Sequence, residues 1–174
     1  MDTTTFQRLA QIRDKFGPGI FGKIAQKLLA LAFYESGFTH IVERGVQGVD
    51  IDAASTDAVK YALEVKTTEG ESVPISEENV DALKDRVKDG YTPLVAVLRM
   101  QMFEDWIFAA IPLSRLQAGS LPLSRLRPYR VSALETSISP TFERVVNEHS
   151  GGVLTGGENY LRQILAQKRV EGIH

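Results

Sequence analysis

The sequence contains no cysteine among its 174 residues. This absence excludes disulfide frameworks, thiolate metal sites and cysteine nucleophiles together. Histidine is also scarce: His40, His149 and His174 are far apart, so they do not form the ligand set of a zinc site. The sequence also lacks the G-x-S-x-G pattern of a serine nucleophile. Any chemistry must therefore come mainly from carboxylates and bases.

Long apolar runs are also missing. The longest, residues 28–34, is much shorter than the roughly 20 residues that span a bilayer. The first residues show no basic segment followed by an apolar one, so we expect a cytoplasmic protein without a membrane partner. Hydrophobic and charged contents of 43% and 24% are typical of a soluble globular domain.

Acidic residues are absent between Trp106 and Leu134, although the formal net charge is −2. A negative balance is unusual for a nucleic-acid-binding protein. Clustered arginines neutralise phosphates whatever the total charge, however. This segment is therefore either a phosphate-binding surface or a solvated basic face, and its arginines are Arg115, Arg125, Arg127 and Arg130.

The spacing of apolar residues predicts helices before Gly17 and over about 22–36, separated by Gly17-Pro18-Gly19, with Gly37 as a left-handed cap. Strands are predicted at 40–44, 49–53, 61–67, 94–99 and 106–111. Ser76 is expected to cap a helix running to about residue 89, and a helix between strands indicates parallel pairing. We therefore predict an α/β fold with a central mixed β-sheet flanked by helices.

After Pro112 the pattern changes. Pro-Leu-Ser-Arg-Leu occurs at 112–116 and again at 122–126, which predicts two short helical turns capped by serine. A glycine-rich loop over 151–157 and a helix over 158–168 follow. We expect an α/β core over residues 1–112 and a helical C-terminal extension over 113–174 packed on the same domain.

Two short segments place acids at a regular separation. Asp50 lies in Gly48-Val49-Asp50-Ile51, and Glu64 in Leu63-Glu64-Val65-Lys66-Thr67. Side chains alternate along a strand, so Glu64 and Lys66 share one face. If the strands pair in antiparallel fashion about Asp57, Asp50 lies opposite Glu64, with Cβ atoms about 4.5–5.5 Å apart. Two carboxylates that close favour a divalent cation between them, and Mg²⁺ prefers oxygen ligands.

Other interpretations of these residues exist. Glu64 and Lys66 could form a solvent-facing ion pair on an edge strand. Asp52 falls opposite Ala62 in the same register and is expected to support the site or to pair with Lys60.

A glycine-rich motif over residues 17–23 is close to a phosphate-binding loop. Ile24 follows Lys23 where such a loop needs a hydroxyl, and the preceding segment is predicted to be helical instead of extended. We therefore expect no nucleotide cofactor. Backbone amides at the start of the next helix could still contact a DNA phosphate.

Residues 22–111 resemble the PD-(D/E)xK nuclease superfamily, and most closely its archaeal Holliday-junction resolvases. The resemblance rests on five segments: residues 22–27, 36–38, 48–51, 64–66 and 93–97. It implies a restriction-endonuclease-like fold, cleavage of DNA that depends on Mg²⁺ with Mn²⁺ as a substitute, and a homodimer.

The resemblance also implies roles for individual residues. Asp50 and Glu64, with the Val65 carbonyl, would hold the metal, and Lys66 would orient the attacking water. Gln26 stands where resolvases usually have a glutamate, so that position brings no charge. The DNA-binding candidates are Lys23, Arg44, Arg115, Arg125, Arg127 and Arg130.

The sequence therefore predicts a metal-dependent, structure-selective DNA endonuclease. One alternative is a restriction-type or homing endonuclease whose segment after Pro112 reads a base sequence. Another is a DNA-binding module that has lost activity, as Gln26 hints.

Overall fold

The computed structural model describes residues 1–43, 48–57 and 59–168. Its main helices are α1 (Thr3–Glu35), α2 (Glu77–Lys88) and α3 (Ser132–Gln167). Its strands are β1 (His40–Glu43), β2 (Ile51–Ala54), β3 (Lys60–Thr68), β4 (Ser72–Ile75), β5 (Thr92–Arg99), β6 (Trp106–Ala109) and β7 (Gly119–Pro122). Three short 3₁₀ turns, η1 (Leu113–Arg115), η2 (Leu123–Arg125) and η3 (Arg127–Tyr129), lie between β6 and α3.

The central sheet is mixed, as the sequence predicts. Its strand order is β1-β2-β3-β5-β6, so β3 is the middle strand. β3 and β5 are parallel and are joined through α2, whereas the other pairs are antiparallel. Residues 94–98 of β5 are buried, as expected for a strand covered on both faces. The five predicted strands all form, with ends that differ by a few residues.

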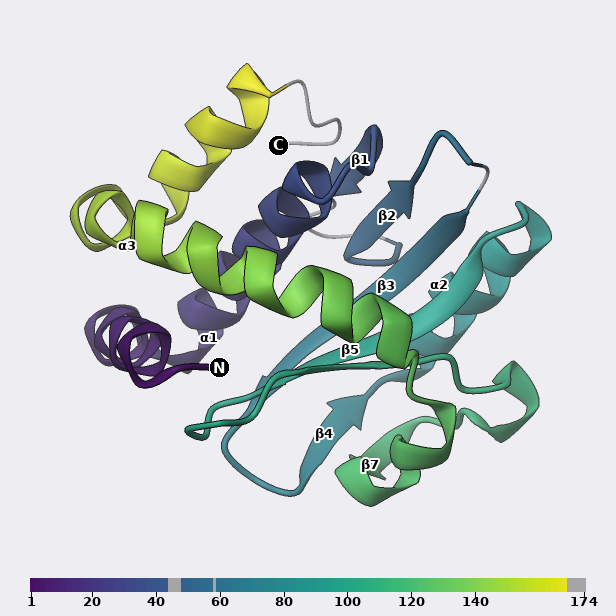
Figure 1. Ribbon diagram of the computed structural model, residues 1–174. Coiled ribbons are helices and arrows are strands. Elements are labelled where there is room, and N and C mark those ends of the chain that lie inside the picture. The colour runs from purple at the N-terminus through teal and green to yellow at the C-terminus, as the bar shows by residue number, and fades with distance from the viewer. Residues whose placement is uncertain (44–47, 58, 169–174) are drawn as a thin grey trace.

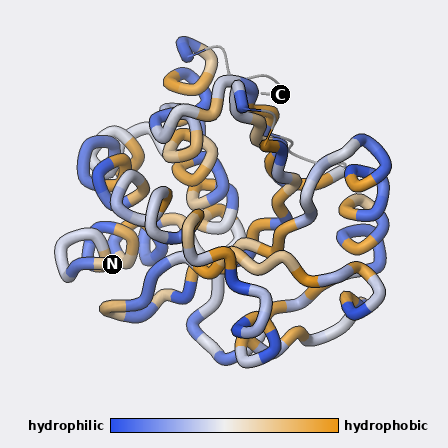
Figure 2. Tube along the Cα trace, turned by 45° about the vertical axis from the view of Figure 1, so that its right-hand side comes forward, coloured by the Kyte–Doolittle hydropathy of each residue, from blue (hydrophilic) through white to orange (hydrophobic). Residues whose placement is uncertain are grey.

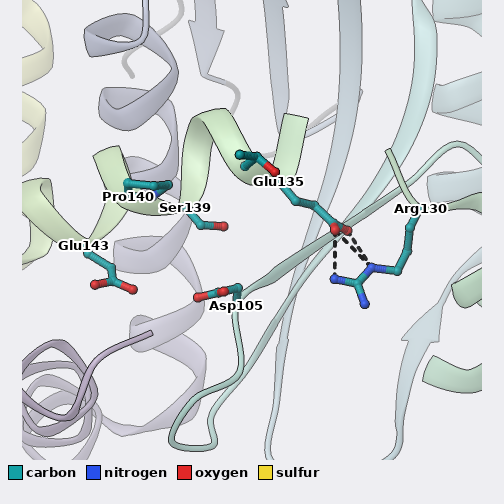
Figure 3. Close-up of a pocket in the computed structure, with 7 residues that line it drawn as sticks. Asp105, Arg130, Glu135, Ser139, Pro140 and Glu143 are labelled. Carbon is teal, nitrogen blue, oxygen red and sulfur yellow. Dashed lines mark hydrogen bonds and ion pairs between the residues drawn. The ribbon is translucent and has the colours of Figure 1, made fainter. Parts of the chain in front are cut away.

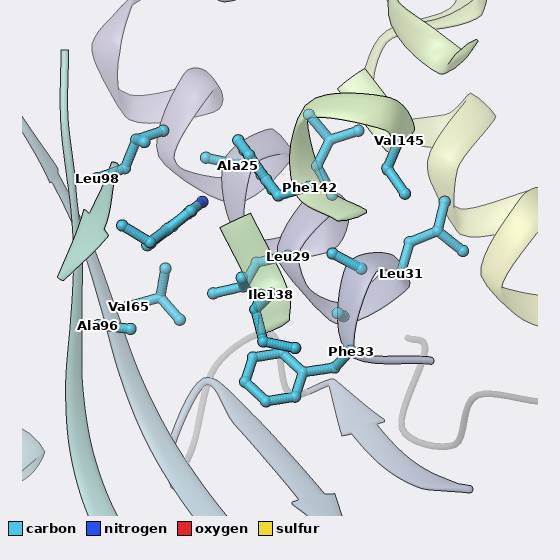
Figure 4. Packing of buried hydrophobic residues seen from close by; sticks show 14 of the residues in the cluster. Ala25, Leu29, Leu31, Phe33, Val65, Ala96, Leu98, Ile138, Phe142 and Val145 are labelled. Carbon is cyan, nitrogen blue, oxygen red and sulfur yellow. The ribbon is translucent and has the colours of Figure 1, made fainter. Parts of the chain in front are cut away.

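Helices α1 and α3 cover one face of the sheet, where α3 lies across α1 (Figure 1). Side chains from both helices meet strand residues in one apolar cluster, with Leu29 from α1, Val65 from β3 and Phe142 from α3 among them (Figure 4). A second cluster on the other face joins α2 and the small β4–β7 sheet to the strands. Hydrophobic segments accordingly concentrate at the strands in the middle of the molecule (Figure 2).

Helix α1 is two helical segments that meet at Gly17. This glycine has φ +77° and ψ 164°, an extended left-handed conformation that side chains disfavour, and Pro18 opens the second segment. The predicted break is therefore confirmed. Gly37, with φ +95°, ends the second segment as predicted.

Helix α2 begins where the sequence predicts. The Ser76 hydroxyl accepts from the Asn79 amide at 3.2 Å, and the Asn79 side chain accepts from the Ser76 amide at 3.0 Å. This reciprocal cap fixes the first turn of α2. Gly90, with φ +81°, follows its last turn.

Two expectations for the C-terminal half are wrong. Residues 151–156 are helical within α3, and only Gly157 leaves the helical conformation. The repeated pentapeptides do form short turns, η1 and η2, but their serines lie inside the turns and make no capping hydrogen bond. The small β4–β7 sheet and residues 132–150 of α3 have no counterpart in the sequence prediction. Among the described residues, neither of the two long helices, nor any other, is apolar enough over its length to cross a membrane.

Candidate functional site

The β2–β3 pair brings Asp50 and Glu64 together. Ile51 pairs with Leu63 and Asp52 with Ala62, which is the register that the sequence predicts. Asp50 directly precedes β2, and its Oδ2 accepts a 2.7 Å hydrogen bond from the Val65 amide. The backbone of β3 thus holds the Asp50 carboxylate beside Glu64.

Glu64 is a buried carboxylate in the middle of the sheet. Only 1% of its surface is exposed, and β2 and β5 flank its strand on both sides. The Lys66 ammonium lies 2.6 Å from Glu64 Oε1. The other oxygen, Oε2, is buried and has no hydrogen-bond partner among the described residues. A solvent-facing ion pair on an edge strand is therefore wrong for Glu64 and Lys66.

Burial sets the charge state of the two acids. Loss of solvation, followed by the charge of Glu64, raises the pKa of Asp50 to about 7. Burial likewise raises the pKa of Glu64, against the opposing effect of Lys66. A cation that binds between two such carboxylates would favour their charged forms and displace their protons to the solvent.

Gln26 approaches this pair from α1. Its Nε2 donates to the Asp50 carbonyl at 3.1 Å and to Glu43 Oε1 at 2.8 Å. Glu43, at the end of β1, pairs in register with Ile51 and also accepts from Lys27 at 2.9 Å. The sequence reasoning overlooked both Glu43 and Lys27. The available signal for Glu43 was an acid that directly follows the apolar residues Ile41 and Val42 in the strand predicted to precede Asp50.

Asp52 has a different partner from the one expected. It is fully buried and binds Arg86 of α2, with 2.9 Å between Asp52 Oδ2 and an Arg86 terminal nitrogen. Arg86 also stacks on Tyr91, with its guanidinium carbon 4.1 Å from the ring centroid. The ammonium of Lys60, the predicted partner of Asp52, instead lies over the same Tyr91 ring, 5.5 Å from its centroid. Asp52 therefore anchors α2 to β2, beside the acidic pair.

The basic candidates lie on several elements. Lys23 is exposed on α1, one turn before Gln26, whereas Arg44 lies outside the described residues. Arg115 donates to the Tyr129 hydroxyl at 2.8 Å, and Arg125 lies 3.5 Å from the Arg115 carbonyl. The two guanidinium groups border a pocket of about 320 Å³ whose other lining residues are Ile111, Leu121, Ser124, Pro128 and Tyr129. We call these residues the arginine pocket. The nearby Arg127 is exposed.

Arg130 belongs to a different hollow. It forms a two-pronged ion pair with Glu135, with nitrogen to oxygen distances of 2.8–3.0 Å (Figure 3). Glu135 also accepts from the Phe108 amide at 3.1 Å. Arg130 thus joins the start of α3 to β6, and its charge is largely matched by Glu135.

The acidic pair offers a partial ligand set for a divalent metal. In the described part of the chain, no group of three or more His, Cys, Asp or Glu side chains is placed to hold an ion. Two carboxylates, one with an unpartnered oxygen, and a neighbouring peptide carbonyl nevertheless suit Mg²⁺, which keeps several of its waters. The residues present therefore fit such an ion.

The fold is similar to that of a solved structure. The chain is similar to Hjc, a Holliday junction resolvase from the archaeal hyperthermophile Archaeoglobus fulgidus, with a TM-score of 0.53 and 20% sequence identity. The similarity covers 67% of this chain and 96% of Hjc. No family model matches the chain, and no curated protein matches it by sequence. The likeness thus lies in the architecture, and it leaves about a third of this chain without a counterpart.

Proposed function

We propose that this protein is a metal-dependent endodeoxyribonuclease that hydrolyses phosphodiester bonds at branched DNA. The observation that carries the proposal is the position of Asp50, Glu64 and Lys66. Two carboxylates of raised pKa and an ammonium gather at the middle of a resolvase-like sheet. Titratable groups perturbed by burial and by each other are typical of active sites.

In this proposal Asp50, Glu64 and the Val65 carbonyl hold Mg²⁺, for which Mn²⁺ substitutes. When bound, such an ion would supply the positive charge that makes a water more acidic and polarises the scissile phosphate. Lys66 lies beside Glu64 and is only partly exposed, so its charge acts strongly on groups near it. We assign Lys66 to positioning the attacking water and to stabilising negative charge on the phosphate.

The arginine pocket and Lys23 are proposed to bind the DNA backbone. Ile111 and Leu121 at the pocket belong to the same apolar cluster as Ala62, which lies two positions before Glu64 on β3. Alternation along the strand therefore places Glu64 on the face of the sheet that bears the arginine pocket. DNA held by this pocket could approach the acidic pair from that face. Arg44 and Arg127 are further candidates, and we expect a homodimer to engage two arms of a junction.

A DNA-binding module without activity is the second candidate. The neutral side chain at Gln26 and the presence of only two clustered carboxylates in the described residues favour it. Such a module would bind branched DNA and leave it intact.

Cleavage mapping separates these functions. The purified protein would be incubated with a four-way junction, a flap and random duplex, each with Mg²⁺ or Mn²⁺. We expect symmetric nicks near the branch point and, in single-turnover assays, rates lowered at least about 100-fold by Asp50→Asn, Glu64→Gln or Lys66→Met. Asp57→Asn is the control, since Asp57 is an exposed acid in the turn between β2 and β3.

Each contrary result has a distinct meaning. Binding without cleavage by the wild type supports the inactive module. One recurring cut sequence on random duplex supports a restriction-type enzyme. Cleavage that survives all three substitutions shows that the acidic pair is not the catalytic site.

A further inference from the structure

A chain of polar contacts, buried at Gln26, Lys27 and Glu43, leads from Asp50 to the last segment of α3. Gln26 joins the Asp50 carbonyl to Glu43, and Lys27 joins Glu43 to Glu158, with 3.2 Å between Lys27 Nζ and Glu158 Oε1. Arg162 completes the chain by binding Glu158 at 2.9 Å. The side chains of Glu43 and Lys27 are only 3% and 4% exposed.

Stability alone is a weak reason for such an ion pair. Taking two charges out of water costs about as much as their attraction returns, and apolar residues of similar size often serve as well. The Lys27–Glu43 pair lies instead beside Asp50, where it determines the surroundings of that residue. Glu43 faces Ile51 in the β1–β2 register, one position from Asp50, and shares Gln26 with it.

The chemistry of Gln26 fits this arrangement. A primary amide nitrogen carries two protons, so it can serve two acceptors at once. Among the described residues, the Glu43 carboxylate and the Asp50 carbonyl are two such acceptors. A glutamate at position 26 would have no proton to give and would set a second carboxylate against Glu43.

We propose that Glu43 is a positioning residue for the Asp50–Glu64 pair, acting through Gln26, and that Glu158 of α3 holds Lys27, and thereby Glu43, in place. The inference rests on the proposed function for its catalytic meaning. It assigns the second segment of α3 a part in shaping the site, although Glu158 does not itself touch Asp50 or Glu64.

Two placement effects follow. The Val65 amide donates to Asp50 Oδ2, so its hydrogen exchange reports the position of Asp50 without any metal. We expect Glu43→Gln and Glu158→Gln each to speed that exchange by about tenfold, as local opening becomes easier. The same variants should weaken Mn²⁺ binding, measured by calorimetry, by about 10-fold, the usual effect of losing a group that orients a ligand. Glu148→Gln, an exposed change on the same helix, should leave both unaltered.

Gln26→Glu gives the sharpest comparison. In the wild-type background we expect it to weaken Mn²⁺ binding, because the new carboxylate meets Glu43. Combined with Glu43→Gln, the same substitution should weaken Mn²⁺ binding much less, since the effects of substitutions within one hydrogen-bond network are not additive. Tighter Mn²⁺ binding by Gln26→Glu alone would overturn the proposal, because it would show that a metal ligand serves better at position 26 than a hydrogen-bond donor.

The remaining outcomes are also decisive. Lower melting temperatures with unchanged Val65 exchange and unchanged Mn²⁺ affinity would show that these polar contacts only stabilise the fold. That result would refute the proposal. If the wild type neither binds Mn²⁺ nor cuts DNA, the proposed function fails. The exchange measurement still decides whether Glu43 and Glu158 position Asp50.

Discussion

Asp50 shows how burial turns an ordinary aspartate into a group that releases its proton near neutral pH. Its pKa moves from 3.8 to about 7, chiefly because burial disfavours the charge and Glu64 lies close by. The folded state thus retains a proton that the unfolded chain has lost. Without metal, this group makes the protein less stable as pH rises from about 4 to 7, with a slope of up to about 1.4 kcal/mol per unit.

Asp50→Asn should remove that pH dependence. The metal-free variant is expected to be more stable than the wild type above pH 7. The difference should shrink as the pH falls toward 4, which is close to the ordinary pKa of an aspartate, 3.8, so that Asp50 keeps its proton in the folded state and is about half protonated in the unfolded chain. Thermal unfolding from pH 4 to pH 9 in the presence of a chelator measures this difference. Asp57→Asn supplies the baseline. A wild type that loses no more stability than Asp50→Asn on going to pH 8 would contradict the raised pKa.

At the scale of elements, the sequence predicted the features that depend on contacts between residues close in sequence. The cap at Ser76, the break at Gly17 and the strand register about Asp57 all involve residues close in sequence, and each is present. The acidic pair could be predicted for the same reason, because one short hairpin forms it.

Partners distant in sequence could not be predicted. Asp52 meets Arg86 because α2 folds back over the sheet, and β4 pairs with β7 across about fifty residues. Each of those two strands contains a proline and has only one neighbour, so neither shows a strong strand pattern. Glu43 and Glu158 also contact Lys27 from distant positions in the sequence, so sequence motifs did not indicate these ion pairs.

The glycines of α3 show how tertiary packing overrides local propensity. Gly151 is helical with open space around its Cβ position, whereas Gly157 has φ +60° and ψ −145°, and a Cβ there would lie 3.3 Å from Phe16. The paired glycines predict a loop because glycine by itself favours loops over helices. The apolar face of α3, buried against α1, supplies the stability that composition does not reveal.

Gly157→Ala and Gly151→Ala should therefore act in opposite directions. Alanine at 157 must adopt a backbone region open essentially to glycine alone, which costs about 1–3 kcal/mol. Alanine at 151 should stabilise α3 by about 0.5–1 kcal/mol. Denaturant unfolding of both variants measures these changes. Equal losses at the two positions would show that residues 151–157 form a loop after all.

At the scale of the whole molecule, the charge distribution matters more than its sum. The net charge is −2, yet residues 106–134 contain four arginines and no acid. Two of these arginines border one pocket, while Arg130 is matched by Glu135. Residues 106–134 thus carry a local positive charge, which under the proposed function would attract DNA to an otherwise acidic protein.

Arg115→Gln combined with Arg125→Gln should weaken binding to every DNA substrate alike. Each lost phosphate contact reduces the slope of log affinity against log salt by about 0.9, so the double variant should lose about 2. Fluorescence anisotropy over a salt series measures the slope. Arg144→Gln, on α3 across the sheet, is the matched control and should keep the wild-type slope. A double variant with the wild-type slope would remove the arginine pocket from the DNA interface.

The proposed function depends above all on Asp50 and Glu64 binding one divalent ion together. Anomalous diffraction from a crystal soaked in Mn²⁺ at neutral or higher pH tests it most directly. We expect a single strong peak within about 2.0–2.3 Å of an oxygen from each carboxylate, with waters completing the coordination shell. Well-ordered carboxylates with no peak between them, or a peak bound only elsewhere, would contradict it.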